Sequence, residues 1–403
     1  MILSMKEYIP RDIEKKLSAL VKTFPAVGLT GPRQSGKSTL LKHLFSDKYL
    51  YLTFDDPLVR RRALDDPKLF LSQEKKIILD EIQYLPEILP YIKMEIDNDR
   101  QTSSRFIITG SQQFPVIKNL GESLAGRIGL LELLPFSINE VASKFKNKTT
   151  LDIFLFSCLN GLYPELLTKK HLSSDWYASY INTYLERDVK SIYDIGSLRD
   201  FSKFLQLLAS RTGQILNLST YSNEIGVSVN TLKKWISILE ASRIIYLLEP
   251  YGENFGKRLS RSPKIYFLDC GTACYLTEVT NKSMILKGNM FGQLFETFCI
   301  QETIKIFQSK GKRPSMYYLR TKDGLEIDLI LKINNNLYPI EIKSSKTPNI
   351  SMTSSIEKFI SLSKKSNIKK SYLLSLSEES HSLTRNVNLI TFKEYITWLK
   401  NII

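Results

Sequence analysis

The chain is poor in cysteine and histidine, with 4 cysteines and 3 histidines among 403 residues. Their spacing matches no zinc-binding pattern, and disulfide frameworks are typical of much shorter secreted chains. No apolar run approaches the roughly 18 residues that a membrane helix needs. The first residues, MILSMKEYIPRDIEKK, carry acids early and lack an apolar stretch of signal-peptide length. These absences predict a cytoplasmic protein with no membrane partner, no structural zinc and no disulfide bridges.

Acidic residues are also fewer than basic residues. The chain has 41 Asp and Glu against 56 Lys and Arg, which gives a formal net charge of +15. This balance favours an anionic partner such as DNA, although a solvated lysine-rich surface would give the same excess. The hydrophobic fraction of 43% is ordinary for a globular protein. The length is enough for about two to four domains.

The most informative stretch is TGPRQSGKSTLL, which begins at Thr30. It fits the phosphate-binding pattern G-x-x-x-x-G-K-[ST], between a strand-like run at 26–29 and a helix-like segment at 39–45. Glycines let backbone N–H groups turn toward an anion, and the helix N-terminus adds partial positive charge. Lys37 would reach the outer phosphates of a nucleotide, and the Ser38 hydroxyl would bind Mg²⁺. We expect the nucleotide to be held by Gly31, Pro32, Arg33, Gln34, Ser35, Gly36, Lys37, Ser38 and Thr39.

A second landmark is Ile77–Glu81, IILDE, where a short apolar strand delivers two carboxylates at its carboxyl end. Asp80 would hold the Mg²⁺ ion, and Glu81 would orient and polarise the attacking water in phosphoryl transfer. A later strand-like run ends in TGSQ, where Thr109 or Ser111 would sense the γ-phosphate; a capped turn would have the same sequence. The order of elements predicts an open parallel α/β sheet with its ligand at the carboxyl ends of the strands.

Together these features resemble the AAA+ family of ATPases. The resemblance rests on the phosphate loop, the Asp80–Glu81 pair, the polar strand end, and the arginine of LAGR before a strand-like run at 128–134. It implies Mg²⁺-dependent binding and hydrolysis of ATP. It also places Arg127 where this family often has an arginine finger, which completes the site of a neighbouring subunit and requires a homo-oligomer. A structural arginine at the edge of its own sheet is the alternative.

The middle of the chain has mostly helical periodicity from 139 to 211, interrupted by GLYPE at 161–165. The next segments read as helix, glycine turn, helix, strand and strand, at 219–224, 226–228, 229–241, 244–248 and 264–268. This order resembles a winged-helix domain, whose wing would carry Lys257, Arg258 and Arg261. The residues of its second helix that would face DNA are Asn230, Thr231, Lys233 and Lys234. Winged helices also bind proteins, so DNA contact and protein docking both remain open.

The C-terminal segment combines carboxylates and a lysine in a pattern typical of metal-dependent nucleases. We expect one helix and three strands, at 291–307, 317–320, 326–333 and 337–343. Glu341 and Lys343 are separated by one residue of a strand, so they would share a face, and Asp328 on the adjacent strand would lie opposite them. With Glu296 from the helix, the three carboxylates would bind a divalent cation, while Lys343 would act in catalysis on water or phosphate.

This constellation resembles the PD-(D/E)xK nuclease superfamily. Ile327 stands where the signature has proline, and Asp323 or Glu326 would be an alternative to Asp328. Members of that superfamily often keep the fold without activity, and alternating charges on a solvent-facing sheet would look similar. The resemblance therefore implies the fold, while cleavage of DNA remains open.

As a whole, the chain resembles bacterial and archaeal ATP-binding proteins with an AAA_14-type core and a DUF4143 region. The resemblance is carried by GPRQSGKS, ILDEIQ, YLERDV, SPKIYFLDCG and IEIKSSK. We expect an α/β protein with a P-loop AAA+ ATPase core, a helical region, a winged-helix domain and a restriction-endonuclease-like domain, at 1–138, 139–210, 211–285 and 286–403. Three functions remain open: an ATPase that acts on DNA, an ATP-regulated switch for a protein partner with an inert nuclease-like domain, and a nuclease in which the nucleotide only stabilises the fold.

Overall fold

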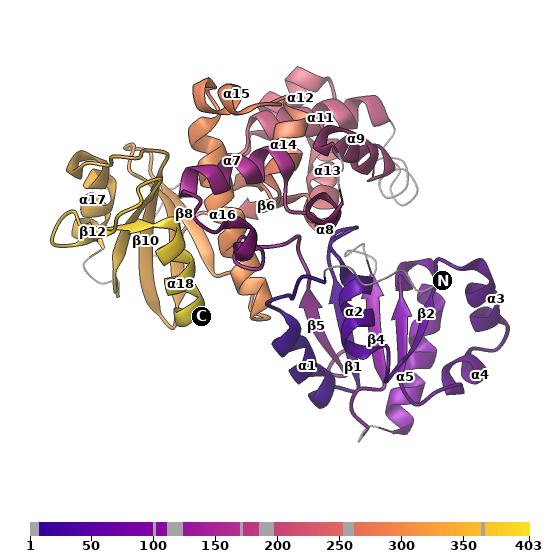
Figure 1. The fold of residues 1–403 in the computed structure, drawn as a ribbon. Coiled ribbons are helices and arrows are strands. Elements are labelled where there is room, and N and C mark those ends of the chain that lie inside the picture. The colour runs from indigo at the N-terminus through magenta and orange to yellow at the C-terminus, as the bar shows by residue number, and fades with distance from the viewer. Residues whose placement is uncertain are drawn as a thin grey trace.

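The computed structural model of the chain describes residues 8–99, 102–110, 124–169, 172–184, 197–252, 262–363 and 367–403. Figure 1 shows a parallel sheet with its helices at one end of the molecule, a helical middle part above it, and a second large sheet at the other end. We call these the N-terminal part, with its elements at 14–132, the middle part, with its elements at 142–287, and the C-terminal part, with its elements at 291–402.

The N-terminal part is the open parallel α/β sheet that the sequence predicts. Its described strands follow the order β2–β3–β4–β1–β5, all parallel. The strands are β1 Ala26–Thr30, β2 Leu50–Thr53, β3 Ile77–Asp80, β4 Phe106–Gly110 and β5 Ile128–Glu132. Every residue of β1, β3 and β4 is buried, because apolar helices cover both faces of the sheet. The carboxyl ends of these central strands therefore meet at one edge.

Helices on the two faces of this sheet form separate apolar cores. Leu17 of α1 and Leu40 of α2 lie in one core, and Ala63 of α3 and Ile92 of α5 lie in the other. The helices are α1 Glu14–Thr23, α2 Lys37–Phe45, α3 Pro57–Asp65, α4 Pro67–Ser72 and α5 Leu89–Asn98, with short 3₁₀ turns η1 Ile82–Tyr84 and η2 Pro86–Ile88.

The middle part packs helices from its beginning and its end against each other. Its helices are η3 Ala142–Phe145, α7 Thr150–Asn160, α8 Pro164–Thr168, α9 Ser173–Thr183, α11 Leu198–Ser210, α12 Leu218–Ile225, α13 Val229–Ala241, α14 Cys270–Leu276 and α15 Lys282–Lys287. Helix α7 contacts α14, and Asp269 before α14 accepts hydrogen bonds from Tyr177 Oη at 2.6 Å and Leu162 N at 3.2 Å. These bonds fix the segment that leads into α8.

Helices α12 and α13 are joined by a tight turn in which Gly226 has φ +83°, a left-handed backbone that favours glycine. Strand β6 (Ile245–Leu248) pairs antiparallel with β7 (Lys264–Phe267), and Ile215 forms an antiparallel bridge to Lys264. The predicted order of helix, turn, helix and two strands is thus present. The basic residues expected in the wing, Lys257, Arg258 and Arg261, lie outside the described residues.

The C-terminal part is a mixed sheet in the order β12–β13–β11–β10–β9–β8. The strands are β8 Met316–Arg320, β9 Glu326–Ile333, β10 Asn336–Lys343, β11 Ser371–Ser375, β12 His381–Ser382 and β13 Val387–Thr391. The long helix that packs against this sheet and the helices that follow are α16 Phe291–Ser309, η6 Ile350–Thr353, α17 Ser354–Leu362 and α18 Phe392–Ile402. The predicted helix and the three predicted strands all form, whereas α17 and β12 were not predicted.

Backbone hydrogen bonds join the middle part to the edge of this sheet. Tyr251 N donates to Tyr318 O at 2.7 Å, and Tyr318 N donates to Glu249 O at 3.0 Å. One apolar core runs through both parts, from α7 and α13 to α16 and β10. The middle and C-terminal parts are therefore packed as a continuous body.

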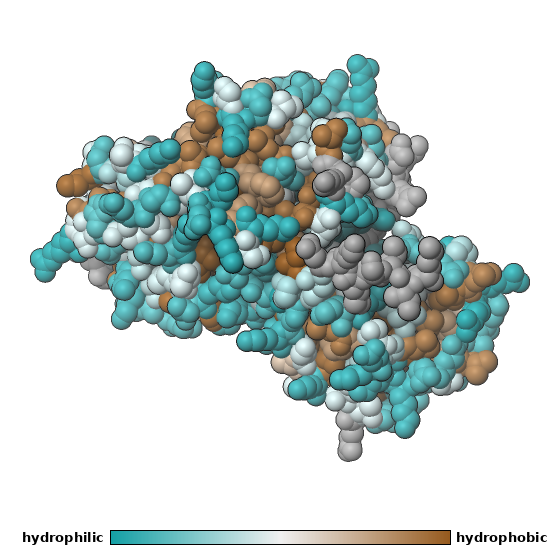
Figure 2. All heavy atoms as spheres, viewed as in Figure 1, coloured by the Kyte–Doolittle hydropathy of each residue, from teal (hydrophilic) through white to brown (hydrophobic). Residues whose placement is uncertain are grey.

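Among the described residues, no helix is both long and apolar enough to cross a membrane. Hydrophilic side chains predominate on the face shown in Figure 2, and hydrophobic ones gather there in smaller separate patches.

Candidate functional site

The glycine loop joins β1 to α2 through a left-handed backbone. Gly31, Gln34 and Gly36 have φ values of 143°, 59° and 95°. A Cβ on Gly31 would lie 2.1 Å from the carbonyl oxygen of Leu133, so only glycine fits there. Gly36 is the N-cap of α2 and supplies no side-chain cap, which leaves the first N–H groups of the helix available to a ligand. The loop thus presents backbone N–H groups at the positive end of a helix dipole.

The first turn of α2 carries the two side chains that the motif requires. The buried Lys37 folds back on the loop, with Nζ 3.0 Å from Gly31 O and 2.9 Å from Pro32 O. Ser38 Oγ donates a hydrogen bond to Asp80 Oδ2 at 2.9 Å. The structure therefore brings the glycine loop and the acid pair at the end of β3 together, as the sequence predicts.

Asp80 accepts hydrogen bonds from hydroxyl groups on both neighbouring strands. Tyr51 of β2 donates to Oδ2, and Thr109 of β4 donates to Oδ1. Burial, with the Asp80 carboxylate beside it, raises the pKa of Tyr51 far above its ordinary value, so this hydroxyl remains a donor. No motif in the sequence indicates Tyr51, whose only signal is a hydroxyl group between two leucines of a short strand.

Thr109 lies behind the acid pair, fully buried, and links its two members. Its Oγ1 bonds to Asp80 and also accepts the backbone N–H of Glu81 at 3.0 Å. The alternative predicted sensor, Ser111, lies outside the described residues. The contacts of Thr109 are those of a group that positions Asp80 and Glu81.

Glu81 leaves the strand through a left-handed backbone with φ 59°. For a non-glycine residue this conformation is uncommon, and it is often found at functional sites. The Glu81 carboxylate accepts a hydrogen bond from Gln83 Nε2. Burial, with the negative charges of Glu81 and Asp80, raises the pKa of nearby Asp55. This edge of the sheet is therefore strongly acidic, which suits a bound cation.

A cavity of about 320 Å³ opens over the loop, within the range of ligand pockets of about 300–1,000 Å³. One wall is made by Gln34, Gly36, Lys37, Ser38, Thr39 and Glu81. The other wall comes from α8 and the residue after it, with Pro164, Glu165, Thr168 and Lys169. Sequence reasoning missed this second wall, and the only signal was the glycine and proline of GLYPE.

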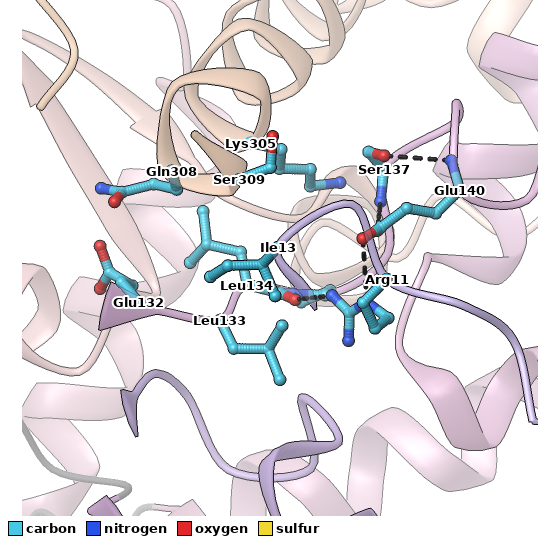
Figure 3. A pocket seen from close by; sticks show the side chains of 11 residues that line it. Arg11, Ile13, Glu132, Leu133, Leu134, Ser137, Glu140, Lys305, Gln308 and Ser309 are labelled. Carbon is cyan, nitrogen blue, oxygen red and sulfur yellow. Dashed lines mark hydrogen bonds and ion pairs between the residues drawn. The ribbon is translucent and has the colours of Figure 1, made fainter. Parts of the chain in front are cut away.

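Arg11, just before α1, ties the loop to the end of the sheet. Its guanidinium donates to Ser35 O at 2.9 Å and to Leu134 O at 2.6 Å, and it pairs with Glu140 at 3.0 Å. Figure 3 shows Arg11 bonded to Leu134 and to Glu140. The ring of Phe136 lies 4.4 Å from the guanidinium carbon. No pattern in the sequence indicates this buried contact.

Arg127 is not part of this cavity. It precedes β5, whose start is beside Ala26 at the opposite edge of the sheet from the loop. Its guanidinium makes a two-fold ion pair with Asp97 of α5, at 2.8 and 3.0 Å. A catalytic role of Arg127 would therefore have to be in the site of another subunit, and it stays a prediction.

The predicted nuclease-like residues lie together where α16, β9 and β10 meet. Asp328 Oδ2 accepts the backbone N–H of Ile342 at 2.9 Å. Lys343 Nζ lies 2.6 Å from Glu341 Oε1 and 3.6 Å from Asp328 Oδ2. Burial raises the pKa of Glu341 to about 8, and its Oε2 has no hydrogen-bond partner among the described residues.

A lysine that the sequence analysis did not single out completes this cluster. Lys264 Nζ lies 2.9 Å from Glu326 Oε1, 3.1 Å from Glu296 Oε1 and 3.7 Å from Asp328 Oδ1. Burial, opposed by the Lys264 charge, raises the pKa of Glu296 to about 7. Within the described ranges, no group of three or more His, Cys, Asp or Glu is arranged to hold a metal ion.

The parallel sheet, the glycine loop at the start of α2 and the acid pair at the end of β3 define a P-loop ATPase core. In agreement, the profile of the AAA domain family (AAA_14) matches residues 23–142. Two domains of unknown function follow, DUF8612 at residues 151–283 and DUF4143 at residues 291–395. The predicted DUF4143 region is thus confirmed for the C-terminal part only, since the middle part matches a separate domain family.

Relatives match most of the chain. The uncharacterized protein Rv2008c of Mycobacterium tuberculosis is 30% identical over 85% of this chain and 75% of its own length. The uncharacterized protein MJ1637 of Methanocaldococcus jannaschii is 25% identical over 81% of this chain and 76% of its own. The chain belongs to the family of Rv2008c and carries an AAA domain followed by DUF8612 and DUF4143 domains.

Solved structures resemble the chain more distantly. The Walker-type ATPase PABY2304 of Pyrococcus abyssi aligns with 68% of this chain and 99% of that chain, with 15% sequence identity and a TM-score of 0.47.

Proposed function

We propose that the protein is a Mg²⁺-dependent ATPase whose nucleotide lies between the glycine loop and α8. The observation that carries the proposal is the convergence of Lys37, Ser38, Asp80 and Glu81, of which all but Asp80 line the cavity directly. The match to an AAA domain, together with the absence of a guanine-reading Asn/Thr-Lys-x-Asp pattern, favours ATP over GTP.

Each side chain of this cavity has a role that follows from its position. The N–H groups of the loop and Lys37 would bind the phosphates, and Ser38 and Asp80 would hold Mg²⁺, which neutralises phosphate charge when bound. Glu81 would orient a water molecule and accept its proton. Tyr51 and Thr109 keep Asp80 oriented through their hydroxyl groups.

Two substitutions test this proposal. Lys37→Ala should abolish ATP binding, measured by calorimetry, because the phosphates lose their main cation. Glu81→Gln should keep ATP binding but lower kcat by about 10²-fold or more, because the general base is lost. The exposed Lys48→Ala and Glu87→Gln are the matched controls and should behave as the native protein. Normal hydrolysis by both Lys37→Ala and Glu81→Gln would refute the proposed roles.

We infer DNA as a second partner, bound through the middle part. The order of α11, the Ile215 bridge, α12, α13, β6 and β7 supports a winged-helix assignment. On α13, Leu232 and Trp235 are buried in the core, whereas Lys233 and Lys234 are exposed. The exposed face of this helix is therefore basic, as a helix that contacts phosphates or base edges requires.

The DNA contact is tested with a fluorescent duplex over a range of salt concentrations. The double variant Lys233→Glu and Lys234→Glu should weaken binding and lower the slope of log Kd against log salt by about two. Lys282→Glu with Lys287→Glu on α15 is the matched control for the change in net charge. No binding to native protein at low salt, or equal affinity of both double variants, would leave the protein-switch function as the better proposal.

A further inference from the structure

A lysine of the middle part lies inside the carboxylate cluster of the C-terminal part. Lys264 is the first residue of β7, is 3% exposed, and has its ammonium group between carboxylates of α16 and β9. The ring of Tyr318 lies 5.6 Å from the same nitrogen. Tyr266, two positions along the strand, donates a hydrogen bond to Glu296. The strand thus inserts a cation and a hydroxyl donor into one acidic site.

The ammonium group occupies the place that a divalent cation would need. Glu296 and Asp328 are two of the three carboxylates that the sequence predicts as metal ligands, and Lys264 contacts both. The third, Glu341, is joined to Asp328 through Lys343. A metal ion would need the same oxygens at about 2.0–2.6 Å. The ammonium group blocks that approach and repels a second cation at close range. The residues present therefore do not fit a divalent cation beside Lys264.

Backbone contacts hold Lys264 in this position from both sides. Lys264 pairs with Leu248 of β6 and forms a bridge to Ile215. Next to it, Ile265 N donates to Gln214 O at 3.0 Å. The segment after β6 is bonded to the edge strand β8 of the C-terminal sheet, and Figure 1 shows β6 close to α16 and β8. The lysine is thus part of the joint between the two parts.

We propose that Lys264 is a built-in replacement for a metal ion in this cluster. It neutralises the carboxylates, ties the middle part to the C-terminal part and keeps divalent cations out. The C-terminal part then works without metal-dependent cleavage of phosphodiester bonds, although its sheet and its Glu296, Asp328, Glu341 and Lys343 resemble a nuclease. The latent metal site returns only when the lysine is removed.

Mn²⁺ binding to the full chain without nucleotide tests this inference by electron paramagnetic resonance. The native protein and Asp328→Asn should bind Mn²⁺ equally, because neither has a metal site in the cluster. Lys264→Met should gain one additional bound Mn²⁺, which should also raise its Tm. The double variant Lys264→Met/Asp328→Asn should lose that ion again. Lys282→Met, an exposed lysine change elsewhere, should gain none.

Two results would overturn the inference. One is a Mn²⁺ ion bound by the native protein and lost in Asp328→Asn, which would show that a metal enters beside Lys264. The other is a folded Lys264→Met that gains no Mn²⁺. If Lys264→Met does not fold, the comparison of the native protein with Asp328→Asn decides alone.

Discussion

Around the cavity over the glycine loop, single hydroxyl groups orient the acid pair. Asp80 receives hydrogen bonds from Ser38, Tyr51 and Thr109, each on a different element. A buried carboxylate with this many donors is fixed in one orientation, and the three hydroxyl donors stabilise its charge. Thr109 does more than the others, because it also accepts the Glu81 N–H. The backbone position of the proposed general base therefore depends on the buried Thr109, while Gln83 bonds to its carboxylate.

We expect Thr109→Val to lower kcat by about 10- to 100-fold, as for other residues that orient a ligand shell, while ATP affinity stays nearly unchanged. Valine keeps the shape of threonine but loses the hydroxyl that bonds to Asp80 and to Glu81 N. ATPase kinetics that separate kcat from KM measure the effect. Thr109→Ser should restore activity, and the exposed Thr102→Val is the control. An unchanged kcat in Thr109→Val would contradict the positioning role.

Among secondary-structure elements, those decided by local pattern could be predicted from the sequence. Helix α13 has the predicted bounds, and β9 does too, because periodic apolar residues and turn residues on either side leave little choice. The glycine loop was predicted because glycine, lysine and serine at fixed spacing serve one chemistry. In contrast, the two-residue β12 is too short to have a local signal. Helix α17 does have apolar residues at helical spacing, Ile356 and Phe359, but it was not predicted.

Contacts between distant elements could not be predicted in this way. From the sequence alone, a lysine at the start of β7 is expected to be exposed at the end of a strand. Only the fold brings Glu296 and Glu326 into contact with it. The contribution of α8 to the cavity could not be predicted, because GLYPE matches no known nucleotide-binding motif. Likewise, the left-handed backbone of Glu81 is imposed by tertiary contacts, since glutamate has no preference for it.

Helix α16 is the element that touches all three parts. Near its end, Glu302 accepts the backbone N–H of Ile138 at 2.7 Å, and Lys305 donates to Phe136 O at 3.0 Å. Figure 3 shows Lys305 above the chain that leaves β5. These two side chains also pair with each other at 2.7 Å, so both buried charges are satisfied. Two turns earlier the same helix presents Glu296 to Lys264.

Across the whole molecule, the glycine loop is connected to the C-terminal cluster by packed groups. Arg11 joins Ser35 of the loop to Leu134, and the segment that follows is held by Glu302 and Lys305 of α16. From the other side, α8 of the middle part lines the cavity over the glycine loop. A conformational change of the loop on ATP binding would therefore affect residues that contact both the middle and the C-terminal parts.

A second subunit would complete the cavity if Arg127 acts as an arginine finger. Arg127 lies at the far edge of its own sheet, where its guanidinium makes a partly exposed ion pair with Asp97 and donates to Ala125 O. If Arg127 acts in a neighbouring site, Arg127→Ala should bind ATP normally but lose about 10³-fold in kcat. Mixing it with Glu81→Gln should restore part of the activity, because mixed interfaces combine an intact arginine with an intact Glu81. Asp97→Ala, which removes the partner of Arg127 within its own subunit, should leave activity unchanged. Absence of recovery in the mixture, or loss of activity in Asp97→Ala equal to that in Arg127→Ala, would make Arg127 a structural residue of its own sheet.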